Sequence, residues 1–159
     1  MVTIVKANLS EPSHADALIY LLDLYARDPM GGGKALDAYV KNNLAANLHA
    51  RNDAHVFLAF FTSTPVGLLI CIEGFSTFAC QPLLNIHDVV VTSNYRGQGI
   101  AAKLLEHAEQ LAKDTKCCKL TIEVLEGNRV AQSVYAKCGF GGYALDPKMG
   151  KALFWEKKL

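Results

Sequence analysis

A glycine-bearing turn near the middle of the chain has the residue types of an anion-binding site. Arg96 is followed by Gly97 and Gly99, and apolar residues at helical spacing begin at Ile100. Glycines leave backbone N–H groups open to a ligand, and the N-terminus of a helix carries unpaired donors and partial positive charge. Arg96 adds a full charge beside these donors. The pattern therefore predicts a turn that binds pyrophosphate.

The same residues allow two other interpretations. Residues 97–102 fit the dinucleotide-binding pattern G-x-G-x-x-G/A, but that pattern directly follows its strand, and here several residues intervene. Only 57 residues remain after Ala102, too few for the rest of a two-halved dinucleotide fold. The plain alternative is a helix cap without a ligand. We favour the phosphate-binding turn.

Two motifs in this order resemble the GNAT superfamily of N-acetyltransferases. Residues 91–101 resemble its acetyl-CoA-binding motif, R/Q-x-x-G-x-G/A after a strand exit. Residues 128–140, read as N-x-x-A-x-x-x-Y-x-x-x-G-F, resemble the segment that supplies a pantetheine-contacting Asn and a proton-donating Tyr. Residues 74–78 followed by residues 84–91 are similar to the diamine and polyamine acetyltransferase branch. The resemblance covers about residues 56–140.

The resemblance implies that acetyl-CoA is the cosubstrate. Its pyrophosphate would lie on the glycine turn, and its pantetheine arm would pair with the backbone of the preceding strand. That use of the backbone requires the central strand, residues 84–91, to part from the strand expected at residues 119–125. The implied cofactor-binding residues are Val89, Val90, Val91, Arg96, Gly97, Gln98, Gly99, Ile100, Ala101, Ala102, Asn128 and Tyr135.

The resemblance also implies which groups move protons. Tyr135 lies seven residues after Asn128, two helical turns along the same face, so both can meet one ligand. A tyrosine hydroxyl (pKa ~10) can protonate a departing thiolate (pKa ~8.5), so we expect Tyr135 to be the general acid. A core tyrosine with a satisfied hydroxyl is the alternative.

For the general base we expect His87, in the middle of the central strand. The polyamine-type enzymes carry a glutamate where His87 stands and an aspartate where Asp88 stands. This difference leaves open whether His87 is the base or a structural histidine. In a regular strand only one of the two neighbours faces the cleft, unless a bulge intervenes. The side chains expected to hold a cationic acceptor are Asp88, Asp28, Tyr25 and Glu73.

Composition narrows the function classes. The chain has 159 residues, so we expect a single N-acetyltransferase domain over residues 1–159. A formal net charge of +1 gives no electrostatic footprint for nucleic acid or an anionic membrane.

No apolar run approaches the ~20 residues of a membrane span, and no leader is recognised, so we expect a cytoplasmic protein. Five cysteines without C-x-x-C spacing predict no metal site. The 51% hydrophobic content favours self-association, and we expect a homodimer.

The order of periodic segments predicts the fold class. Strand and helix patterns alternate as β-α-α-β-β-β-α-β-α-β-β, with a last hairpin from residues 140–144 and 152–155. This order gives an α/β fold with a mixed, mainly antiparallel sheet and helices on both faces. We therefore expect an enzyme that moves an acetyl group from acetyl-CoA to a primary amine of a small molecule, by direct attack in a ternary complex. The alternative is a non-catalytic acyl-CoA-binding module on the same fold.

Overall fold

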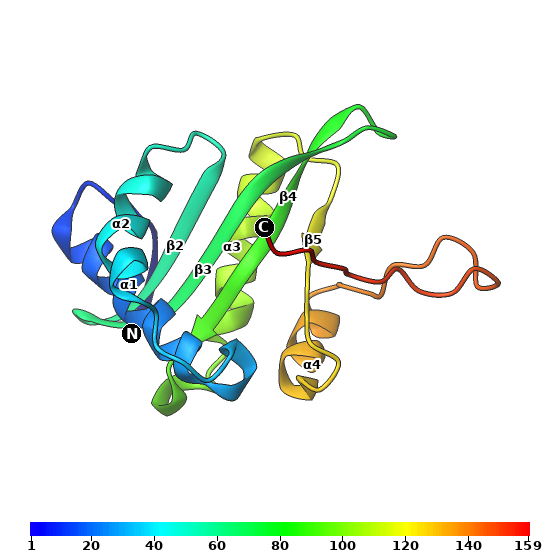
Figure 1. The fold of residues 1–159 in the computed structure, drawn as a ribbon. Helices are drawn as coiled ribbons and strands as arrows, with labels where there is room; N and C mark the ends of the chain where they lie inside the picture. Colours follow the sequence, from blue (N-terminus) through cyan, green and yellow to red (C-terminus); the bar gives the residue numbers. More distant parts are fainter.

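The computed structural model describes residues 1–159 and has the predicted α/β architecture. Its elements, in chain order, are β1 (Val2–Lys6), α1 (Pro12–Arg27), η1 (Pro29–Gly31), α2 (Ala38–His49), β2 (Ala54–Phe61), β3 (Thr64–Ser76), β4 (Gln81–Val91), η2 (Ser93–Tyr95), α3 (Ile100–Asp114), β5 (Leu120–Ile122) and α4 (Arg129–Lys137). The sheet has five strands in the order β1-β2-β3-β4-β5. Every neighbouring pair is antiparallel except the parallel pair β4–β5. Helices α1 and α2 cover one face and α3 the other, while α4 lies beside β5 (Figure 1).

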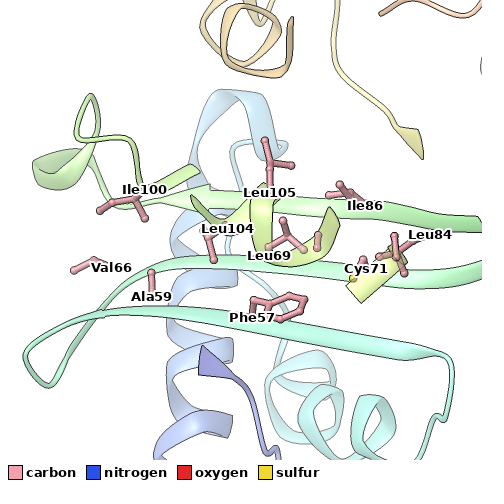
Figure 2. Close-up of a cluster of buried hydrophobic side chains, with 12 residues drawn as sticks. Phe57, Ala59, Val66, Leu69, Cys71, Leu84, Ile86, Ile100, Leu104 and Leu105 are labelled. Atoms are coloured by element: carbon pink, nitrogen blue, oxygen red, sulfur yellow. The ribbon is translucent and has the colours of Figure 1, made fainter. Parts of the chain in front are cut away.

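The strands fold between these helices because their apolar residues are buried on both faces. Alternate residues of a strand point to opposite faces. In β2, Phe57 packs in the cluster that contains α3, and Leu58 packs in the cluster that contains α1. Figure 2 shows the α3 cluster, in which Ile100, Leu104 and Leu105 lie over the strands. The sheet is thus the middle layer of three, and α3 is fixed to it along its whole apolar face.

The start of α3 lies very close to the sheet, at Gly67 of β3. A Cβ added there would lie 3.1 Å from Cβ of Ala59, 3.1 Å from Cγ2 of Ile100 and 3.2 Å from Cδ1 of Leu104. Only a residue without a side chain allows this approach. The contact fixes the N-terminus of α3, and with it the glycine turn, against the end of β4.

The parallel pair β4–β5 splits after a short pairing. Leu84, Asn85 and Ile86 pair with Leu120, Thr121 and Ile122. β4 then continues to Val91, whereas β5 ends at Ile122. The predicted parting of these strands is therefore present, and β5 is shorter than the segment 119–125 that its sequence pattern indicated. Past Ile86, the side of β4 that faces β5 has no strand beside it.

The predicted C-terminal hairpin is wrong. Residues 141–159 contain no strand or helix. Alternating apolar residues favour a strand, but a strand also needs a paired neighbour, and this segment forms a long loop after α4 whose last residues come back over the sheet in Figure 1 without pairing. Its large apolar side chains remain exposed: Tyr143, Leu145, Met149, Leu153, Phe154 and Trp155. Among the helices, none has the length and apolar character to cross a membrane.

Candidate active site

The glycine turn has the open backbone that a phosphate group needs. Gly97 and Gly99 have φ of 75° and 77°, the left-handed region that favours glycine, and no heavy atom lies within 4 Å of the Cβ position of either. Gly99 is the N-cap of α3, and Ile100 is buried directly behind it. A phosphate can therefore approach the backbone of the two glycines without meeting a packed neighbour. At the exit of β4, the buried Oγ1 of Thr92 has no hydrogen-bond partner. These features fit a pyrophosphate at the turn.

Arg96 links the turn to two other parts of the chain. Its Nε donates to the backbone oxygen of Val91 at 3.1 Å, and its Nη2 lies 3.3 Å from Oδ2 of Asp28. Asp28 follows the last residue of α1 and was expected to bind the acceptor. It lies instead against the glycine turn, where the backbone N–H of Met30, and after it the Arg96 guanidinium, lower the pKa of the Asp28 carboxyl.

A β-bulge at His87 turns two consecutive side chains toward the same face. Ile70 of β3 pairs with Asp88, whereas Cys71 pairs with Ile86, so His87 is the extra residue. Ile86 and Val89 both pack in the α3 cluster. The two residues between them therefore face away from α3, toward the side that α1 covers. His87 is exposed and Asp88 is half-buried.

Asp88 lies near two tyrosines that come from different helices. Burial raises the pKa of Asp88, and the neighbouring Glu123 raises it further, while His87 lowers it. Burial, then the proximity of Tyr25 and Asp88, raises the pKa of Tyr135 to about 12. The pKa of Tyr25 is raised by its burial and by the carboxylates of Asp88 and Asp28. Tyr25 from α1, Asp88 from β4 and Tyr135 from α4 thus form one cluster, in which Tyr135 stays protonated.

Helix α4 is fixed so that Tyr135 can reach this cluster. Asn128 is its N-cap, and Oδ1 of Asn128 accepts a hydrogen bond from the backbone N–H of Ala131 at 3.1 Å. The side-chain amide N–H groups of Asn128 have no partner in the protein and stay available to a ligand. The Tyr135 ring packs edge-on against Phe140, with centroids 6.2 Å apart.

A second predicted acceptor residue also lies elsewhere, and one residue at the split was not predicted. Glu73 bonds to Nε2 of His55 at 2.7 Å, on the α3 face of the sheet and not with Asp88. Glu123, directly after β5, lies near enough to Asp88 to raise the pKa of that carboxyl, and its Oε1 accepts a hydrogen bond from Asn85 at 3.3 Å. Its position follows from the parallel register, which the sequence pattern alone does not specify.

The chain belongs to the acetyltransferase (GNAT) family, whose profile matches residues 18–140. It is 33% identical over 112 residues to streptothricin acetyltransferase of Escherichia coli, an alignment that covers 65% of this chain and 62% of that protein. It is 27% identical over 125 residues to thialysine N-epsilon-acetyltransferase of Caenorhabditis elegans, covering 78% and 75% of the two chains. A solved structure described as a probable acetyltransferase superposes with a TM-score of 0.83 at 23% identity, covering 98% of each chain, and shows the shared fold.

Proposed function

We propose that this protein is an acetyl-CoA-dependent N-acetyltransferase that acetylates a primary amine of a small molecule by direct attack in a ternary complex. The observation that carries the proposal is that Asp88, on the unpaired end of β4 that leads into the glycine turn, lies near enough to Tyr135 of α4 to raise the pKa of its hydroxyl. A half-buried carboxylate and a protonated phenol, from two elements on either side of one opening, are the base and the acid that such a transfer requires.

The cofactor side would use the turn and the two elements that flank it. The backbone of residues 97–100 and the guanidinium of Arg96 would hold the pyrophosphate. The free edge of β4 over residues 89–91 would hold the pantetheine arm together with Asn128, whose amide N–H groups are available. Bound acetyl-CoA supplies the thioester acetyl group that the amine attacks.

Asp88 is the better placed base, although the sequence pattern favoured His87. An alkylammonium acceptor (pKa ~10) must lose a proton before its nitrogen can attack. Asp88 lies near Tyr25 and Tyr135, so it could pair with an ammonium at the β4–β5 split and then accept its proton. His87 is exposed at the bulge. We therefore assign proton acceptance to Asp88, and His87 acts as a neighbour that lowers the pKa of Asp88.

Tyr135 would return a proton to the leaving thiolate. A phenol with a pKa of about 12 is a weak acid against an ordinary thiol near ~8.5. The same burial that raises the pKa of Tyr135 would also raise that of a thiol leaving in this cleft, because both conjugate bases are anions that lose hydration. The two pKa values therefore shift together, and the transfer remains feasible.

The acceptor is expected to be a flexible cationic amine. The C. elegans relative is named for the ε-nitrogen of thialysine, a lysine-like amino acid. In this chain, Glu123 and Tyr25 both lie near Asp88, which faces the side of the sheet that α1 covers. These groups suit an ammonium on an alkyl chain, as in lysine analogues, diamines and polyamines. A non-catalytic acyl-CoA-binding module would need the turn but not the Asp88–Tyr135 pair.

Two measurements test the proposal. CoA and acetyl-CoA should raise the melting temperature while NADH does not, and a thiol-release assay across lysine, thialysine, diamines and polyamines should find turnover. Tyr135→Phe should keep the CoA-induced shift and lose on the order of 10²–10⁴-fold in kcat, because the ring still packs while the proton donor is gone. A wild-type protein that binds CoA but acetylates no amine, with Tyr135→Phe indistinguishable from it, would favour the non-catalytic module.

We further propose how the chain is organised outside the site. Residues 1–159 act as one domain, supported by a single sheet with a cluster on each face. The exposed apolar residues of segment 141–159 would be covered in a homodimer. All five cysteines are free, as is usual where thiols are kept reduced, which supports a cytoplasmic location.

A further inference from the structure

The connection between α1 and α2, residues 28–37, is here called the corner. One ion pair joins it to the glycine turn. Asp28 and Arg96, 68 positions apart in the sequence, are joined by Oδ2 and Nη2 at 3.3 Å. The same guanidinium is held from its other side by the backbone oxygen of Val91, which accepts from Nε at 3.1 Å. Arg96 therefore has a defined place between the end of β4 and the corner, even though its side chain is 59% exposed.

The corner is internally tied, and it is connected to the catalytic cluster. Oδ1 of Asp28 accepts from the N–H of Met30 at 2.9 Å, and the Tyr25 hydroxyl donates to the Met30 oxygen at 3.3 Å. Gly31 packs so tightly on the end of α1 that an added Cβ would lie 2.0 Å from the backbone oxygen of Tyr25. A shift of Asp28 is therefore expected to move the corner and the hydroxyl of Tyr25, a residue that lies near Asp88 and Tyr135.

Arg96 has donors to spare for a ligand. A guanidinium has five N–H groups in a fixed plane. Two donate within the protein, to Val91 and Asp28, and the other three have no hydrogen-bond partner in the protein. Arg96 can therefore bind phosphate oxygens without releasing Asp28. Phosphate would then be joined through the guanidinium to the carboxylate, in the planar geometry that arginine favours.

We propose that Asp28 is a positioning residue: it holds Arg96 ready for the pyrophosphate of the cofactor, and through this contact cofactor binding orders the corner that places Tyr25 beside the acceptor. The inference rests on the proposed function. It gives Asp28 a role on the cofactor side, in place of the acceptor contact expected from its sequence position. An exposed ion pair contributes little to folding, so the contact should matter for binding and not for stability.

Asp28→Asn separates the two roles of this carboxylate. The amide oxygen still accepts from the Met30 N–H, while the charge that holds Arg96 is lost. We expect an unchanged melting temperature and a Kd for CoA, measured by calorimetry, that rises roughly two- to fivefold. Asp37→Asn is the matched control, because Asp37 caps α2 in the same way and does not contact Arg96. In an Arg96→Gln background, Asp28→Asn should add no further loss.

Hydrogen exchange supplies a readout independent of affinity. At saturating CoA, the amides of residues 30–34 should exchange more slowly in the wild type and in Asp37→Asn, but not in Asp28→Asn, while residues 97–103 are protected in all three. An unchanged Kd and retained protection of the corner in Asp28→Asn would overturn the inference alone. Tighter CoA binding would also overturn it, because Asp28 would then compete with phosphate for Arg96. A wild-type protein that binds no CoA would instead overturn the proposed function, and this inference with it.

Discussion

Two neighbours shift the pKa of Asp88 in opposite directions, and this makes its role in catalysis testable by pH. Its carboxylate is the form that accepts a proton, so kcat/KM should rise as pH rises through the raised pKa of Asp88. Asp88→Asn should remove that limb and lower kcat/KM on the order of 10²-fold or more. His87→Ala should move the limb to higher pH, since His87 lowers the pKa of Asp88, and Glu123→Gln should move it to lower pH.

The opposite pattern would restore the expectation drawn from sequence. If His87→Ala removes the limb and Asp88→Asn leaves it in place, His87 is the base and Asp88 only binds the acceptor. Glu123→Gln is the control for the direction in which the pH limb moves. It alters the electrostatic surroundings of Asp88 without removing either candidate base.

The Asp88 carboxyl should also lower the stability of the fold at neutral pH. Burial raises its folded-state pKa above the unfolded value of ~3.9, so the folded state binds this proton more tightly. The resulting stabilisation is fully present below the unfolded pKa and is lost as pH rises through the folded pKa. Asp88→Asn should therefore melt higher than the wild type at pH 7 and nearly equal to it at low pH. A lower melting temperature at pH 7 would show that Asp88 makes stabilising contacts as an anion.

At the scale of elements, the position of the glycine turn depends on how closely α3 approaches β3. Gly67→Ala would bring a methyl group within 3.1–3.2 Å of side chains from β2 and α3. We expect it to destabilise the fold by about 1–3 kcal/mol in denaturant unfolding and to weaken CoA binding, because the start of α3 must move. Gly141→Ala, which has no neighbour within 4 Å, should leave both measurements unchanged. A lower free energy of unfolding with an unchanged affinity for CoA would show that the turn moves as a unit with α3.

Element types were predictable where local patterns decide them, and site geometry was not. The 3.6-residue spacing from Ile100 identified α3, and its first residue in the structure is Ile100. The bulge at His87 depends on pairing with β3, so the sequence pattern could not show that His87 and Asp88 share a face. The Asp28–Arg96 contact and the His55–Glu73 bond likewise join residues that are far apart in the chain. Tertiary pairing, and not local propensity, placed these side chains.

At the scale of the whole molecule, residues 140–155 have the alternating apolar pattern of β-strands, which predicted a hairpin. This pattern indicates a segment that can pair with another strand. Its own chain does not pair it in the structure, and Gly139, Gly141 and Gly142 stand at its base, where they permit reorientation. β5 pairs only with β4, so its outer edge is free. The apolar segment of one copy can pair with the free edge of β5 in a second copy. A two-fold arrangement would cover the segments of both copies at once.

The proposed homodimer can be followed through Trp155, the single tryptophan of the chain and 79% exposed in the monomer. Light scattering after size exclusion should give twice the mass of the 17.3 kDa chain, and dilution should shift Trp155 emission to longer wavelength as the dimer dissociates. Leu153→Asp should yield a monomer at concentrations where the wild type is dimeric, because it places a charge in the buried apolar surface. Lys158→Glu, at an exposed charged position of the same segment, should remain dimeric. Monomeric wild type with long-wavelength emission at every concentration would show that the segment is not an interface between copies.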